Sequence, residues 1–361
     1  ENGDFIGPMI SSASDATNED NKLYQYTVNE DCFARIAYKY KISGSYARIY
    51  STDKLIWKKI KELNDANNSG TKRHLKILLL GNSYSSDAWG YVPFILKNYG
   101  ITCEIYMYWR GALSLDDLVK YWETSQAHDA DSPQASLGTY RYLYHIDTRS
   151  DTKWNTMSRM SAKDLVALGG WDIITLLQYS VYTIDYSRYN PYFEQVVSLI
   201  RESIKTPFTL GWQMSWTRPS ADEPESNISA AEQNDKDHAI GITFPCATAI
   251  FNARTNNILN KIGDSANNNL WCSDESHLED GIPCYIAGLA IVQSLFDKYY
   301  SGLNVMNDTT RPTTENIKEW NNPQQQLPVS GEITTVNDEN CYLSQKAAIL
   351  ANKRMFVITN I

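Results

Sequence analysis

The stretch LKILLLGNSYSSDAWG, residues 75–90, decides the fold of this chain, because it leads from a buried strand into a turn and a serine. Its first six residues form a short apolar run that ends at a glycine, which is typical of a strand inside a parallel sheet. Gly81 permits a tight backbone turn, and the polar residues after it are expected to turn helical, with backbone N–H groups directed toward Ser83. The pattern therefore predicts Ser83 at the carboxyl edge of a strand.

The order of strands and helices after residue 75 predicts the architecture. CEIYMY, DIITLL and PFTLGW are further short apolar runs, and helical spacing is found near residues 91–99, 114–123, 190–204, 246–262 and 282–300. Strands that alternate with helices form a parallel sheet covered on both faces. We therefore expect an α/β fold, a three-layer α/β/α sandwich with a central parallel sheet, whose ligands bind beyond the carboxyl ends of the strands.

The residues before this sandwich have a different character. LYQYTV, CFARIAYKYKI and YARIYS alternate β-formers with polar residues around a turn at Ser43-Gly44, which predicts a small antiparallel β-unit. The polar LNDANNSGTKRH acts as a linker. We therefore expect a β-rich extension with its linker over residues 1–72 and an α/β domain over 73–361, with a surface excursion at 304–340 and a C-terminal helix at 341–361 that packs back.

The composition excludes several classes of protein. The 361 residues are 42% apolar, enough for a sizeable core, and the net charge of −9 argues against a nucleic-acid partner. No segment approaches the ~20 apolar residues of a membrane-spanning helix. The six cysteines and five histidines show neither C-x-x-C pairs nor metal-ligand spacing, so neither a disulfide scaffold nor a zinc site is expected, and the cysteines are predicted as buried small apolar side chains. A start at Glu1 without a leader indicates a processed or trimmed chain.

A serine after a strand is often only a helix N-cap, so a catalytic interpretation of Ser83 needs a base elsewhere in the chain. The candidate lies in LWCSDESHLEDGIPCYIAGLAIVQSLF, where Asp274 precedes His277 by three residues and an apolar helix follows. Histidine, with an ordinary pKa of about 6.5, can take a proton from serine and return it, provided that a carboxylate orients the ring. Asp274 can supply that carboxylate, although such spacing also arises by chance, and Asp280 fits a helix cap better.

The order of these motifs resembles the SGNH (GDSL-type) hydrolases, with G-N-S after the first strand, a glycine after the second, an amide after the third and D-x-x-H before the last long helix. More narrowly, ILLLGNSYSSDAWGYVP, FPCATAIFNAR and DESHLEDGIPCYIAG resemble a bacterial subfamily of unknown function that is abundant in polysaccharide-degrading gut bacteria. The resemblance spans roughly residues 75–303 and implies an SGNH/flavodoxin-like sandwich. It also implies that Ser83 is the nucleophile, that His277 is the general base and acid, and that Asp274 orients His277.

The resemblance further implies an oxyanion hole made by the backbone N–H groups of Ser83 and Gly111 and by an amide after the third strand. Most of the family has asparagine at that last position, whereas this chain has Gln178, a longer amide that can still donate a hydrogen bond. Asn82 replaces the aspartate of G-D-S, and asparagine can also tie the turn to nearby backbone. Arg110 stands beside Gly111 where the subfamily often has a second glycine. No metal or organic cofactor is implied.

The aromatic residues bear on the substrate. Ten Trp and 24 Tyr suit contact with sugar rings, although they fit a core and its rim equally well. Two or three members of a predicted aromatic rim are expected to be exposed; together with Asn82, the candidate substrate-binding residues are Trp109, Tyr179, Tyr182, Trp212 and Trp216.

The family context implies an esterase that removes O-acetyl or similar short acyl groups from carbohydrate, in the periplasm, at the cell surface or in the medium. Two alternatives remain open at this point. One is a catalytically weak or inactive glycan-binding protein of the same fold, and the other is a serine site that acts on a peptide or thioester. The sequence leaves the oligomeric state open.

Overall fold

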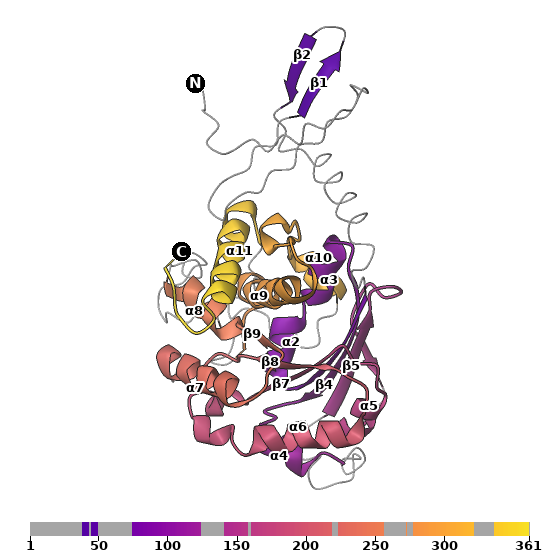
Figure 1. Cartoon of the computed structure of the whole chain (residues 1–361), viewed down its shortest axis with the longest axis vertical. Coiled ribbons are helices and arrows are strands. Elements are labelled where there is room, and N and C mark those ends of the chain that lie inside the picture. Colours follow the sequence, from indigo (N-terminus) through magenta and orange to yellow (C-terminus); the bar gives the residue numbers. More distant parts are fainter. Residues whose placement is uncertain are drawn as a thin grey trace, which may run out of the picture. The chain divides into compact units, whose positions relative to one another are not determined.

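The computed structural model describes residues 38–42, 45–49, 74–123, 141–157, 160–218, 223–255, 272, 277–320 and 336–360. The chain divides into two compact units, Glu1–Gly70 and Thr71–Ile361 (Figure 1). In the first unit, β1 (Tyr38–Ile42) pairs with β2 (Ser45–Ile49) in an antiparallel register from Tyr38↔Ile49 to Ile42↔Ser45. The predicted antiparallel β-unit is therefore confirmed for these two strands.

The second unit is built on a seven-stranded sheet in the order β6-β5-β4-β3-β7-β8-β9. Five strands run parallel, namely β3 (His74–Gly81), β4 (Thr102–Arg110), β7 (Ile173–Leu177), β8 (Thr209–Gln213) and β9 (Ile242–Phe244). At one edge, β5 (Arg141–Asp147) and β6 (Asn155–Met157) add antiparallel pairs. The predicted α/β fold is confirmed, but the sheet is mixed rather than purely parallel.

The antiparallel edge was not predicted because its strands lack a continuous apolar run. In β5, Leu143 and Ile146 are buried while Tyr144, His145 and Asp147 are only partly buried. In contrast, every residue of the central β7 is buried. A strand covered on both faces is recognisable from its apolar run alone, whereas an edge strand is recognised chiefly by the partner it pairs with.

The order of the parallel strands determines where a ligand would bind. Numbered along the chain, these five strands lie in the order 2-1-3-4-5, the flavodoxin-like arrangement. The connection from β3 leads first to β4 on one side, and the later strands are added on the other side. The carboxyl end of β3 is therefore the topological switch point, where ligands of such sheets bind.

Helices cover both faces of the sheet (Figure 1). On one face, four helices contact the long α9 (Ile282–Tyr299), namely α2 (Ser83–Trp89), α3 (Val92–Asn98), α8 (Cys246–Thr255) and α11 (Asp338–Lys353). On the other face, α6 (Tyr192–Ser203) contacts α4 (Leu115–Lys120) and α5 (Ala162–Ala167). Helix α7 (Pro224–Asp237) contacts α8. The predicted three-layer sandwich is confirmed. No described helix combines the length and the apolar character that a membrane crossing requires.

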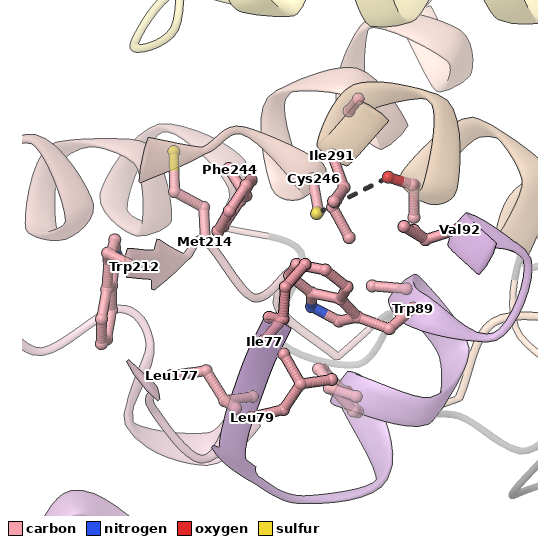
Figure 2. Packing of buried hydrophobic residues seen from close by; sticks show 14 of the residues in the cluster. Ile77, Leu79, Trp89, Val92, Leu177, Trp212, Met214, Phe244, Cys246 and Ile291 are labelled. Atoms are coloured by element: carbon pink, nitrogen blue, oxygen red, sulfur yellow. Dashed lines mark hydrogen bonds between the residues drawn. The ribbon is translucent and has the colours of Figure 1, made fainter. Parts of the chain in front are cut away.

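The core lies between β3 and the helices of the α9 face. Figure 2 shows Trp89 of α2 among Ile77 and Leu79 of β3, Phe244 of β9 and Ile291 of α9. The Trp89 ring meets the Phe244 ring edge-on at 5.1 Å, and all five side chains are buried. The five cysteines that the structure describes are also buried, as expected. Helix α9 is buried along residues 282–296 because the sheet, α8 and α11 surround it, so it is apolar on all sides rather than amphipathic.

The segment predicted as a surface excursion is partly buried. Its described part contains η5 (Val305–Asn307) and α10 (Thr314–Trp320), and the side chains of Val305 and Ile317 are 0% exposed. The hydroxyl of Tyr285 in α9 donates to Asp308 at 2.6 Å. The C-terminal helix α11 packs on α9 as expected, but it begins at Asp338 after an N-cap at Asn337, earlier than the predicted 341. The sequence predicted a surface excursion because polar residues outnumber apolar ones in this segment, and a few apolar side chains, Val305 and Ile317 among them, are the ones that pack into the core.

Candidate functional site

Ser83 is the first residue of α2, directly after the carboxyl end of β3, and Asn82 holds this turn. The side-chain oxygen of Asn82 accepts from the Tyr84 N–H at 2.9 Å, and its amide nitrogen donates to the Leu113 carbonyl at 2.9 Å. Asn82 therefore ties the Ser83 turn to the loop after β4. An ionised aspartate, which cannot donate, would lose the second of these bonds. The predicted substrate contact of Asn82 is corrected, because its side chain is 1% exposed and both ends bind backbone.

The fold brings Ser83 together with His277, which lies 194 residues later in the chain. His277 Nε2 and Ser83 Oγ are 2.7 Å apart, a distance that fits a hydrogen bond. If the ring carries its hydrogen on Nδ1, Nε2 is an acceptor and the serine hydroxyl is the donor. Ser83 is 8% exposed and His277 is half-buried. A serine and an imidazole in this relation can perform nucleophilic catalysis.

The segment after His277 is bonded to residues 87 and 91, in and just after the helix that begins with Ser83. The Leu278 N–H donates to Asp87 Oδ2 of α2 at 3.0 Å, and the Gly281 N–H donates to the Tyr91 hydroxyl at 3.1 Å. Burial, and after it the Asp280 carboxylate, raises the pKa of Tyr91, so this hydroxyl stays neutral. The loop 278–281 is thus held at both ends by the segment 83–91, which keeps His277 in register with Ser83.

The residues on the amino side of His277 are only partly described. Cys272 is buried and forms an isolated antiparallel bridge with Leu278, so it packs beside the site. Asp274 lies outside the described residues, and its orienting role stays a prediction. In the part of the chain that is described, no group of three or more His, Cys, Asp or Glu side chains could hold a metal ion.

Two tryptophans predicted as part of an aromatic rim support the site from inside. Trp216 is 0% exposed and stacks on Tyr84 at 4.4 Å, while the Tyr84 ring meets His277 edge-on at 5.9 Å. Trp212 is also 0% exposed and packs against Phe193. The predicted sugar contacts of Trp212 and Trp216 are therefore wrong for this structure, because neither ring reaches the surface. The sequence predicted both tryptophans at a strand end. It gave no sign of their burial, because the residues that cover them, such as Tyr84 and Phe193, are distant in the chain.

Gln178 is also buried, and its polar atoms have backbone partners. Its Oε1 accepts from the N–H groups of Leu115 at 3.2 Å and Tyr179 at 2.8 Å, and its Nε2 donates to the Arg188 carbonyl at 2.7 Å. Because two partners are donors and the third is an acceptor, these contacts determine the orientation of the amide. The side chain is 0% exposed. The contacts assign Gln178 a positioning role and give no support to the predicted oxyanion donor.

The loop after β4 carries the other predicted oxyanion donor. Around Gly111 there is open space, since an added Cβ would meet only Trp109, at 3.8 Å, and Ala112 has a positive φ of 55°. The Arg110 guanidinium lies 4.3 Å over the Tyr121 ring and 3.7 Å from the Asp117 carboxylate. Gly111 is therefore accessible beside the Ser83 turn, and the roles of the Ser83 and Gly111 N–H groups stay predictions.

Three of the predicted aromatic residues are partly exposed, namely Trp109, Tyr179 and Tyr182, and their contact with a sugar stays a prediction. Trp109 Nε1 donates to Ser86 Oγ at 3.3 Å, and Ser86 in turn donates to the Ser83 carbonyl at 2.6 Å. Arg218 and Arg188, which contact Tyr179 and Tyr182, were not predicted as site residues from the sequence. Each arginine stands alone in a polar segment that contains no recognisable motif. Their contacts are described below.

Gly81 is required for a different reason from the predicted one. A Cβ at this position would lie 2.0 Å from Ser85 Oγ and 2.4 Å from Leu177 Cδ2, so glycine is needed here because of close packing rather than because of an unusual turn.

Gly81→Ala is expected to lower the free energy of unfolding by about 1–3 kcal/mol through overpacking. Urea denaturation measures this loss. Gly288→Ala in α9 is the matched control, because its new Cβ would meet no atom closer than 3.5 Å; an equal loss in both variants would contradict the prediction.

No protein-family model and no curated protein matches the sequence. Among solved structures, the chain is similar to a DUF4886 family protein from Bacteroides uniformis, with 20% identity and a TM-score of 0.61 over 80% of this chain and 98% of that one. A "putative SGNH hydrolase" from Slackia heliotrinireducens overlaps with 13% identity and a TM-score of 0.37 over 62% of this chain and 99% of that one. The first similarity shows a shared fold, in agreement with the predicted sandwich, while the second is too low to support an argument.

Proposed function

We propose that this chain is a serine esterase that removes short acyl groups, O-acetyl above all, from carbohydrate. The observation that supports this proposal most directly is the 2.7 Å contact between Ser83 Oγ and His277 Nε2. The position of Ser83 also supports the proposal, because Ser83 follows β3 at the switch point of the sheet, where ligands of such sheets bind. The start of α2 does not depend on the Ser83 hydroxyl, because Asn82 is the N-cap residue of this helix.

The geometry supports acyl transfer in two steps. Ser83 Oγ attacks the ester carbonyl carbon while His277 Nε2 takes the hydroxyl proton, and the resulting tetrahedral oxyanion is stabilised by the N–H groups of Ser83 and Gly111. When the intermediate collapses, His277 returns the proton to the departing sugar oxygen and the acyl group stays on Ser83. A water molecule, deprotonated by His277, then releases the acid and restores the serine. Asp274 is proposed to hold the Nδ1–H of His277 through both steps.

The proposed substrate class, an acylated carbohydrate, rests on three partly exposed aromatic side chains. Trp109, Tyr179 and Tyr182 are partly exposed at the ends of β4 and β7, the same edge of the sheet as Ser83. Tyrosine and tryptophan rings suit the apolar faces of sugars. We further propose, from the family context, that the protein acts in the periplasm, at the cell surface or in the medium, which cell fractionation would test.

The experiment compares wild type and Ser83→Ala on 4-nitrophenyl acetate and on acetylated xylan. Acetate release by the wild type and none by Ser83→Ala is the expected result. Ser85→Ala, on the same helix and also buried, with 0% of Ser85 exposed against 8% of Ser83, is the matched control and should keep its activity. Equal rates for wild type and Ser83→Ala would end the esterase proposal. Binding to xylan without acetate release would favour the glycan-binding alternative.

A further inference from the structure

Two arginines flank the two partly exposed tyrosines at the carboxyl end of β7, and we call these four residues the Arg–Tyr row: Arg218, Tyr179, Tyr182 and Arg188. Arg218 Nη2 donates to the Tyr179 hydroxyl at 2.8 Å, and the rings of Tyr179 and Tyr182 meet edge-on at 5.6 Å. The Arg188 guanidinium lies 4.0 Å over the Tyr182 ring. The row therefore alternates cationic groups with aromatic rings.

Arg218 is the member of the row whose charge is least compensated. A guanidinium has five N–H donors. Two of the hydrogen bonds described for Arg218 are to neutral oxygens, Tyr179 Oη and Ser180 Oγ at 3.4 Å. Within the described residues, no carboxylate lies within ion-pair distance of Arg218, whereas Arg188 has Asp116 at 3.8 Å. Within the described residues, donors thus remain on Arg218 for an external acceptor.

The row and Ser83 lie at the same end of the sheet, because Tyr179 follows β7, which pairs with β3. Arg218 comes two residues after Trp216, a step of at most about 7 Å along an extended chain. The Trp216 ring stacks on Tyr84, which follows Ser83 and meets His277 edge-on. On the other side, Tyr179 follows Gln178, which bonds to the start of α4. A sugar unit on the row would therefore lie at the same end of the sheet as the unit whose ester reaches Ser83.

We propose that the Arg–Tyr row binds a carboxylate-bearing sugar, so that the substrate is an acylated glycan containing uronic acid units. This inference rests on the proposed esterase function. The planar fork of a guanidinium matches a carboxylate with two parallel hydrogen bonds, and the tyrosine rings can support the sugar beside it. The net charge of −9 would repel an acidic polymer, so such a substrate needs a local cationic site.

The test uses one acetylated pectin in two forms, with its carboxylates ionised and with the same carboxylates methyl-esterified. For the wild type, kcat/KM is expected to be higher on the ionised form, and the preference should fall with added salt. In Arg218→Gln the ratio of the two kcat/KM values is expected to fall about tenfold, mainly through KM. Arg218→Lys, which keeps the charge without the fork, should lose part of the preference.

The control is Arg201→Gln, an exposed arginine in the last turn of α6, which should keep the wild-type ratio. The two possible failures are separable. If the wild type shows no Ser83-dependent hydrolysis of 4-nitrophenyl acetate, the esterase function itself is wrong. If that hydrolysis is present but Arg218→Gln and the wild type have the same ratio on the two pectins, the esterase function stands and the carboxylate site is overturned. A loss in Arg218→Gln that is equal on both pectins would also overturn it, since it would reflect folding or general binding.

Discussion

Replacing Ser83 with alanine is expected to lower kcat for ester hydrolysis by about 10⁴-fold or more, and His277→Gln is expected to do the same. The reason is that Ser83 Oγ and His277 Nε2, 2.7 Å apart, share one proton transfer, and neither group can perform it alone. The double variant is therefore expected to be no worse than either single variant. Steady-state kinetics on 4-nitrophenyl acetate measures all three.

The same variants are expected to fold normally, which thermal unfolding measures; Ser83 is 8% exposed and His277 is half-buried at the carboxyl end of the central strand β3. Mass spectrometry adds a direct readout, since wild-type protein quenched during turnover should carry an acetyl group on Ser83 and His277→Gln should not. Losses that multiply in the double variant would mean that the two residues act in separate steps. That result would contradict the proposed mechanism even if both single variants were slow.

The second large effect is expected at Asp87. Asp87→Ala removes the acceptor of the Leu278 N–H, which leaves a buried donor unpaired at a cost of about 1–3 kcal/mol in unfolding free energy. It also releases the loop that begins at His277, and a displacement of about 1 Å at a catalytic group can cost on the order of 10²-fold in rate. We therefore expect kcat to fall by about 10²-fold with little change in KM.

Two further variants separate positioning from general stability. Asp87→Asn keeps an oxygen that can accept from Leu278, so it should recover most of the lost kcat. Tyr285→Phe removes a buried hydroxyl that donates to Asp308 at 2.6 Å but keeps the backbone bond from the Tyr285 N–H to the Gly281 carbonyl, so it should lower stability without lowering kcat. If Asp87→Ala and Tyr285→Phe reduced kcat equally, the positioning role of Asp87 would be refuted.

Much of the architecture could be read from local patterns. The apolar runs at Leu75–Leu80 and Ile173–Leu177 predicted central strands, because a strand buried on both faces needs apolar side chains at most positions. The Ser83 turn and the helix after His277 could also be predicted from the residues next to them in the sequence. The edge strands β5 and β6 and the buried part of 304–320 were missed, because their residues are only partly apolar and their packing partners are distant in the chain.

At the candidate site, the residue types could be predicted but their roles could not. The sequence by itself determined which chemical groups are present and on which elements they lie, since strands, turns and helices depend on neighbours within a few residues. The tertiary structure decided the rest. It placed Ser83 against His277 and bonded Leu278 to Asp87. It also enclosed Gln178 and Trp216 and left Arg218 beside Tyr179. These outcomes depend on burial and on hydrogen bonds between segments that lie up to 194 residues apart in the chain, which no local pattern encodes.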